Sequence, residues 1–123
     1  MNGTAQSRAK MKNSKILLDM ADILSHEGAW KPGALAWDDY SYISTAKPCD
    51  PMSEEAQSWS VEGACIKSSG GDKSAWASVK RHILAFSPKL GTDSREITHE
   101  MVWNLLKGAY YHAYLCEMSQ QAK

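Results

Sequence analysis

The spacing of apolar residues constrains this chain most, because in four separate segments it fits the 3.6-residue period of an α-helix. The first segment predicts a helix from about Ser14 to Glu27, with Asn13 or Ser14 as its cap and Gly28 as its stop. Its apolar stripe consists of Ile16, Leu17, Met20, Ile23 and Leu24. A chain with this pattern is expected to build its core from packed helices.

Three further helices are predicted, over about 50–67, 72–86 and 98–118. Their start signals are, in order, Asp50-Pro51 or the nearby Ser53-Glu54, Asp72, and Thr98. Gly63 lies inside the second of these helices, where Gly costs about 1 kcal/mol relative to Ala. We therefore expect another backbone to approach Gly63 closely.

Residues 34–45 do not follow the helical period. They mix aromatic and β-branched side chains around Asp38-Asp39, which favours either a short hairpin or an ordered loop. The predicted fold is therefore mostly α, a compact four-helix domain with a short β-hairpin or ordered loop after the first helix. We expect a flexible basic tail over 1–13, a single helical domain over 14–118 and a frayed end over 119–123.

Length and charge exclude several classes of protein. A chain of 123 residues is too short for a two-domain enzyme, and 14 basic against 14 acidic residues argue against general nucleic-acid binding. No apolar run reaches the roughly 18 residues of a membrane span, and the first residues lack the apolar stretch of a signal peptide. We expect a cytoplasmic protein.

One interpretation of the glycine-rich segment Ser68–Ser74 is a phosphate-binding loop at a helix start, with Lys73 and Ser74 as ligands. It lacks the spacing of a P-loop, and the carboxylate of Asp72 would compete with an anion for the same backbone amides. A plain turn between two helices is the favoured interpretation.

Cysteine and histidine give no local catalytic or metal-binding signature. The three cysteines are widely spaced, and no Cys/His pair is taken as a zinc ligand set. The four histidines lie far apart in the sequence, so no metal site, no catalytic residue and no cofactor is predicted. A Cys/His or Asp/His pair assembled only by the fold stays open as an alternative.

The aromatic composition is unusual, with five Trp and five Tyr against one Phe. Trp and Tyr combine an apolar ring with a polar tip and therefore suit a pocket wall or an interface. Four of them cluster after the first helix and are predicted to stack a ligand: Trp30, Trp37, Tyr40 and Tyr42. Lys73 and Arg81, with Lys80 beside it, are the predicted phosphate partners. For Trp59, Trp76 and Trp103, core packing is favoured.

Several short motifs occur in a recognisable order. They are Gly28-Ala29-Trp30, Gly33-Ala34-Leu35-Ala36, Asp50-Pro51, Ala56 with Trp59, and Gly63-Ala64-Cys65, followed by a closing helix after Thr98. In this order the chain resembles a family of small uncharacterised proteins from actinobacteria and their phages, over about residues 14–115. Departures include Ala29 between Gly28 and Trp30, Ser60 where many members resemble Cys, and Cys65 in place of Leu. The resemblance implies a phage or bacterial accessory protein and carries over no catalytic residue.

The residues predict a non-catalytic small binding protein. The resemblance implies that this protein is phage-encoded, acts in the host cytoplasm and inhibits bacterial defence. It would sequester a nucleotide-like signalling ligand or block a host defence protein. One alternative is a small Cys/His-dependent hydrolase or transferase, and another is an accessory subunit whose exposed aromatic residues form a homo-oligomer.

Overall fold

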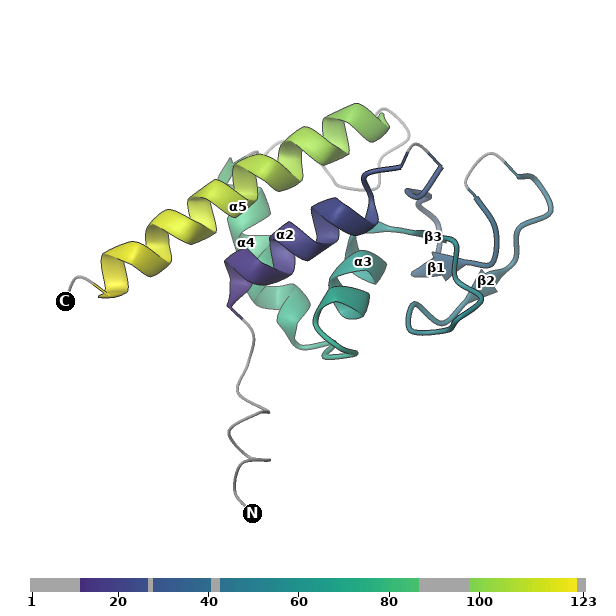
Figure 1. Cartoon of the computed structure of the whole chain (residues 1–123), viewed down its shortest axis with the longest axis horizontal. Helices are drawn as coiled ribbons and strands as arrows, with labels where there is room; N and C mark the ends of the chain where they lie inside the picture. Colours follow the sequence, from purple (N-terminus) through teal and green to yellow (C-terminus); the bar gives the residue numbers. More distant parts are fainter. Residues whose placement is uncertain (1–11, 27, 41–42, 87–97, 122–123) are drawn as a thin grey trace, which may run out of the picture.

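The computed structural model describes residues 12–26, 28–40, 43–86 and 98–121 (Figure 1). This part of the chain contains four helices and three two-residue strands, so the predicted mostly α, four-helix fold is confirmed. The elements are α2 (Asn13–Ile23), β1 (Ala36–Trp37), β2 (Pro48–Cys49), β3 (Ser58–Trp59), α3 (Val61–Ser68), α4 (Ala75–Phe86) and α5 (His99–Gln121).

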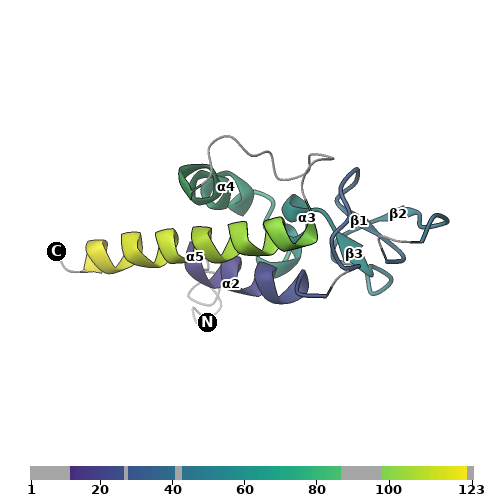
Figure 2. The ribbon, with the colours of Figure 1, turned by 90° about the horizontal axis from the view of Figure 1, so that it is seen from above.

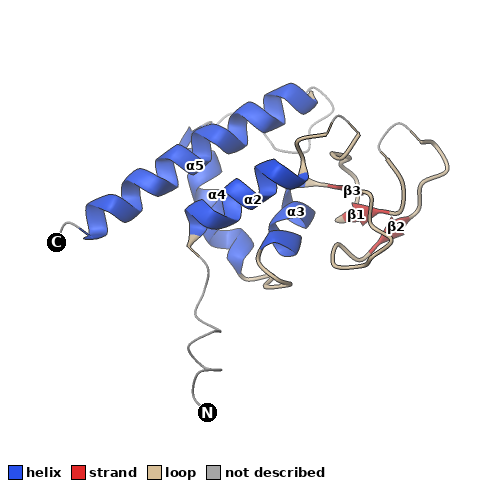
Figure 3. Cartoon of the chain, in the orientation of Figure 1, coloured by secondary structure: helices blue, strands red, loops and turns tan. Residues whose placement is uncertain are grey.

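The long helix α5 organises the molecule. It packs against α2 and α4, which lie on either side of it when the molecule is seen from above (Figure 2). The helix α3 packs under α2 and α4, and the small sheet lies beyond α3 at one end (Figure 3). The core contains Ile16, Leu17, Met20 and Ala21 of α2, Leu24 and Ala29 beyond its end, Val61, Ala64 and Cys65 of α3, Ala75, Val79 and Ile83 of α4, and Val102, Leu105, Leu106, Ala109 and Ala113 of α5.

Side chains of α5 hold both ends of α2. Lys12 occupies the N-cap position and makes no side-chain cap, so neither Asn13 nor Ser14 caps the helix as predicted. The Glu117 carboxylate instead accepts hydrogen bonds from the Ser14 backbone N–H at 3.0 Å and from its hydroxyl at 2.6 Å. At the other end, His99 Nε2 lies 2.5 Å from the carbonyl oxygen of Leu24, just beyond the last helical residue. Distant residues therefore replace the local caps, and α2 ends at Ile23 rather than near Glu27.

The extended segment after α2 forms a three-stranded antiparallel sheet of order β2-β1-β3. Ala36 of β1 pairs with Cys49 on one side and with Trp59 on the other. Only β1 falls within the predicted extended segment. The strand β2 lies in residues for which the sequence predicted no element, and β3 lies within the second predicted helix.

The second predicted helix is wrong over its first half. Asp50 Oδ1 accepts a hydrogen bond from the Met52 N–H, and the Ser53 N–H donates to the Asp50 carbonyl, which closes a turn. The helix begins only at Val61, with the Ser60 hydroxyl accepting from the Gly63 N–H as its cap. Aspartate before proline and serine before glutamate start turns as well as helices, so the local signal was ambiguous.

The other boundaries differ from the predictions by a few residues. The third helix begins at Ala75 rather than Asp72, and α5 continues to Gln121 rather than fraying after residue 118. The predicted tail falls mostly on residues 1–11, which lie outside the described residues.

Candidate functional site

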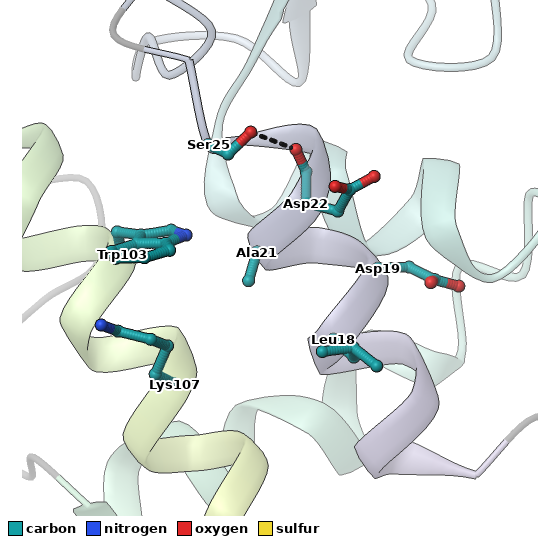
Figure 4. Close-up of a pocket in the computed structure, with 7 residues that line it drawn as sticks. All are labelled: Leu18, Asp19, Ala21, Asp22, Ser25, Trp103 and Lys107. Atoms are coloured by element: carbon teal, nitrogen blue, oxygen red, sulfur yellow. Dashed lines mark hydrogen bonds between the residues drawn. The ribbon is translucent and has the colours of Figure 1, made fainter.

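A pocket of about 450 Å³ lies between α2 and α5 (Figure 4). Most of its wall is apolar. The lining residues are Leu18, Asp19, Ala21, Asp22 and Ser25 from the α2 side and Trp103 and Lys107 from α5. Figure 4 shows Trp103 and Lys107 projecting from α5 toward the side of α2 that carries Ala21.

Trp103 is the largest side chain in this pocket, and its side chain is 37% exposed. The predicted core packing of Trp103 is therefore wrong. Its neighbour Val102 is fully buried, and successive residues of a helix point about 100° apart, so Trp103 falls on the edge of the packing face. The Lys107 ammonium lies 3.8 Å from the centre of the ring, a cation–π contact one helical turn away.

The charged groups of the pocket lie at its rim. Asp19 and Asp22 point away from Trp103 in Figure 4, and Asp19 pairs with Lys15 at 3.1 Å. The Ser25 hydroxyl donates to the Asp22 backbone carbonyl at 2.8 Å. The pocket therefore has two carboxylates at its α2 edge, one ammonium on α5 and an apolar floor, which suits an uncharged flat group better than an anion.

The predicted aromatic residues do not form a single site. Trp30 and Trp37 are half-buried at the sheet, where the backbone of Trp30 forms a bridge with Trp59 and the Lys31 ammonium lies 4.5 Å from the Trp37 ring centre. Tyr40 is 40% exposed and lines a second pocket of about 290 Å³. The other residues of this second pocket are Asp22, Ile23, His26, Ala29, Gln57 and Trp59. Tyr42 lies outside the described residues.

The other two tryptophans for which core packing was predicted do pack against the core. Trp59, at the end of β3, and Trp76, in α4, are partly buried and pack against the core. Trp59 also donates its indole N–H to the Pro51 carbonyl oxygen at 3.1 Å. Sequence reasoning placed Trp59 in a helix, and the structure places it in a strand.

The predicted phosphate partners lie apart from these pockets. Arg81 is exposed on α4, which lies across α3 from the sheet in both Figure 1 and Figure 2. Lys73 is exposed in the turn between α3 and α4. Neither side chain lines the Trp103 pocket or the Tyr40 pocket, so the structure does not bring them together with the aromatic residues.

The glycine-rich segment forms a turn between α3 and α4. Gly70 and Gly71 take positive φ angles of 73° and 95°, which favour glycine. Asp72 Oδ1 accepts from the Ser74 N–H at 3.0 Å and from the Ser74 hydroxyl at 2.5 Å. The Asp72 carboxylate thus accepts the hydrogen bond from the Ser74 N–H that an anion would need, as the sequence predicts.

The fold brings together three side chains that sequence reasoning left apart: His82 of α4 and His112 and Cys116 of α5. The two Nδ1 atoms of His82 and His112 lie 2.9 Å apart, and the Cys116 sulfur lies 4.0 Å from His112 Nδ1. Burial lowers the pKa of His82, the neighbouring His112 and Arg81 lower it further, and Glu117 opposes them. Neutral imidazole is thus favoured at this position.

Part of this cluster could have been found in the sequence. His112 and Cys116 are four residues apart in a strongly predicted helix, a spacing that places both on one face. The contribution of His82 could not have been found in the sequence, because it depends on how α4 packs against α5.

The remaining cysteines are held as thiols. Burial raises the pKa of Cys65 to about 12, with Glu62 and Asp72 adding to the effect. Partial burial, followed by the carboxylates of Asp38, Glu55 and Asp50, raises the pKa of Cys49. A raised pKa disfavours the thiolate, which is the form in which a nucleophilic cysteine reacts.

No protein-family model, curated protein or solved structure matches this chain. The class that the fold defines is therefore a small, mostly α domain of four helices with a three-stranded antiparallel sheet. Among the described residues, no helix is both long enough and apolar enough to cross a membrane.

Proposed function

We propose that this chain is a non-catalytic binding protein that takes a flat, nucleobase-like ligand in the Trp103 pocket. The observation that carries the proposal is a large aromatic side chain, 37% exposed, on the wall of a mostly apolar pocket of about 450 Å³. That volume is in the range of small-molecule sites. Stacking on an indole contributes about 1–3 kcal/mol per base.

The charges at the rim of the pocket narrow the range of nucleotide-like ligands that the sequence led us to expect. Asp19 and Asp22 accept hydrogen bonds and repel phosphate, whereas Lys107 is the pocket's one basic side chain. A base with amino donors, carried by a nucleoside, therefore fits better than a nucleoside triphosphate. The predicted phosphate partners Lys73 and Arg81 play no part in this site.

The Cys/His-dependent hydrolase or transferase is less well supported. Cys116 and His112 do approach each other, at 4.0 Å, but both lie inside α5. The backbone amides around Cys116 are used by the helix, so they cannot stabilise an oxyanion beside the sulfur. This absence of free donors in the helix favours the non-catalytic function.

The wider role, a phage-encoded inhibitor of bacterial defence, rests on the sequence resemblance alone and stays a prediction. A captured nucleoside-type signal would fit it, as would a blocked host protein. Affinity capture from host lysate with the Trp103→Ala variant as control would separate a pocket-dependent partner from unspecific binding.

The first test of the pocket is isothermal titration calorimetry with adenosine, guanosine and ATP. We expect the two nucleosides to bind and ATP to bind more weakly, because its phosphates meet Asp19 and Asp22. Loss of stacking in Trp103→Ala should weaken nucleoside binding about 5- to 150-fold, the equivalent of 1–3 kcal/mol.

Tyr111→Ala is the matched control. Tyr111 is an aromatic residue on the same helix, is 65% exposed and does not line the pocket. Its truncation should leave nucleoside affinity unchanged. Equal losses in both variants, tighter binding of ATP than of adenosine, or no heat with any of the three compounds would contradict the proposed ligand class.

A further inference from the structure

The cluster of His82, His112 and Cys116 lies where α4 packs against α5, close to the start of α2. His112 and Cys116 are one turn apart on α5, and His82 faces them from α4. The candidate ligand atoms all lie within 4.8 Å of one another, and all three residues are half-buried. The cluster thus combines three donors from two helices at a site that solvent can still reach.

The spacing of these atoms is close to that of a tetrahedral metal site. Metal–nitrogen bonds of about 2.05 Å at the tetrahedral angle place two nitrogens about 3.3 Å apart, and a bond of about 2.3 Å to sulfur places it about 3.6 Å from each nitrogen. The Nδ1 atoms are 2.9 Å apart and Cys116 Sγ is 4.0 Å from His112 Nδ1. Each of these two distances needs a change of about 0.4 Å. Rotation of the Cys116 side chain can bring the sulfur nearer to His82.

We infer that His82, His112 and Cys116 bind a divalent transition metal of the zinc class. Imidazole and thiolate together suit Zn²⁺ and disfavour Mg²⁺ and Ca²⁺, which take oxygen ligands. Binding releases the Cys116 thiol proton to solvent, and both histidines coordinate as neutral rings. The fourth position is left to water, because the neighbouring Glu117 carboxylate is already bound to Ser14.

Asn13 supports the site from α2. Its side-chain nitrogen lies 3.2 Å from His82 Nε2, the ring nitrogen that faces away from His112. When His82 Nδ1 binds a metal, Nε2 carries the proton and donates it, and a flipped Asn13 amide presents its oxygen there. Asn13 is thus a positioning residue that fixes the tautomer of His82.

The test is titration of the full chain with Co²⁺, followed by competition with Zn²⁺. One equivalent of Co²⁺ should give the visible bands of a tetrahedral ion together with a thiolate-to-cobalt charge-transfer band, and Zn²⁺ should abolish both. Cys116→Ala should lose the charge-transfer band, and His82→Gln should weaken binding at least tenfold.

Cys49→Ala and His26→Gln are the matched controls, since each removes the same kind of donor outside the cluster. Both should bind Co²⁺ as the parent chain does. Binding without the charge-transfer band, or binding that Cys116→Ala and His82→Gln leave unchanged, would overturn the inference, as would no binding at 100-fold excess of Co²⁺ in a folded protein.

Two further readouts do not depend on the spectra. Zn²⁺ should protect Cys116 from iodoacetamide while Cys49 reacts as before, which mass spectrometry of the peptides resolves. Asn13→Asp should raise Zn²⁺ affinity by about tenfold and Asn13→Leu should lower it, because a carboxylate orients a ligand histidine better than an apolar group. Equal Zn²⁺ affinity in the two Asn13 variants would show that Asn13 does not position His82.

The metal site and the nucleoside pocket are separate. His112 lies nine residues beyond Trp103, about 13 Å along the axis of α5. Trp103→Ala should therefore leave Co²⁺ binding unchanged, and His82→Gln should leave nucleoside binding unchanged. Either proposal can fail while the other stands.

Discussion

Three thiols of the same chain lie in three different surroundings. Cys65 is fully buried beneath α2, and its pKa is raised to about 12. Cys49 lies in β2, where partial burial and then the nearby carboxylates raise its pKa. Cys116 is half-buried in α5, and its sulfur lies 4.0 Å from Nδ1 of His112. Reactivity toward an electrophile should follow these surroundings rather than exposure alone.

We expect the metal-free native protein to be alkylated fastest at Cys116, more slowly at Cys49 and hardly at all at Cys65. At pH 8 a thiol with a pKa of about 12 is only about one part in 10⁴ thiolate. Time-resolved iodoacetamide labelling read by peptide mass spectrometry gives all three rates in one experiment. Denatured protein is the control, because the three alkylation rates should converge there. Alkylation of Cys65 as fast as that of Cys116 in the native protein would contradict the described core.

At the scale of elements, the helices were predictable wherever an apolar stripe continues for three turns or more. The stripes of α2, α4 and α5 made these helices recognisable without tertiary information, apart from their ends. The extended segment that holds β1 was predicted, but its two partner strands were not, because they follow β1 by about ten and twenty residues. Two-residue strands carry too little periodicity to be found alone.

Gly63 lies where α3 packs against the segment that leads into the sheet, and the close backbone approach expected from the sequence is confirmed there. A Cβ at this position would overlap the backbone carbonyl of Leu35, in the segment that leads into β1. Leu35 is held there because its carbonyl also accepts from the Ser60 N–H at 3.2 Å. The helix α3 can therefore pack against this strand only when residue 63 has no side chain.

Gly63→Ala should destabilise the protein by about 3 kcal/mol, the upper part of the range for overpacking, because backbone cannot yield as a flexible side chain can. Chemical denaturation followed by circular dichroism measures this loss. Gly70→Ala is the control, since nothing lies near its Cβ, and it should cost about 1 kcal/mol for the left-handed backbone at a φ of 73°. A Gly63→Ala variant no less stable than Gly70→Ala would rule out the close packing.

At the scale of the whole molecule, α5 connects both proposed sites to the fold. Its buried stripe packs on α2 and α4, its edge carries Trp103 and Lys107, and its second half carries His112 and Cys116. The sequence predicted the buried stripe. It could not predict the sites, because each needs side chains from another helix: Ala21 and Leu18 of α2 for the pocket, and His82 of α4 for the cluster.

The aromatic site predicted from the sequence also shows that neighbours in the sequence need not share a pocket in the fold. Clustering of Trp30, Trp37 and Tyr40 in the sequence did not lead to a shared pocket, because the first two pack at the sheet and the third turns toward α2. The sequence predicts core packing for Trp103, because a helical tryptophan is usually part of a core. Only its exposure in the folded chain distinguishes it.

Nuclear magnetic resonance tests the central claim most directly, because each of the five tryptophans contributes its own indole N–H signal. Adenosine would be titrated into ¹⁵N-labelled protein, with Trp103→Phe used to assign the Trp103 signal. Ligand stacking in the pocket predicts a saturating shift of the Trp103 indole signal, while the signals of Trp30 and Trp37 stay in place. A shift confined to Trp30 or Trp37, or no shift at any indole, would contradict the account.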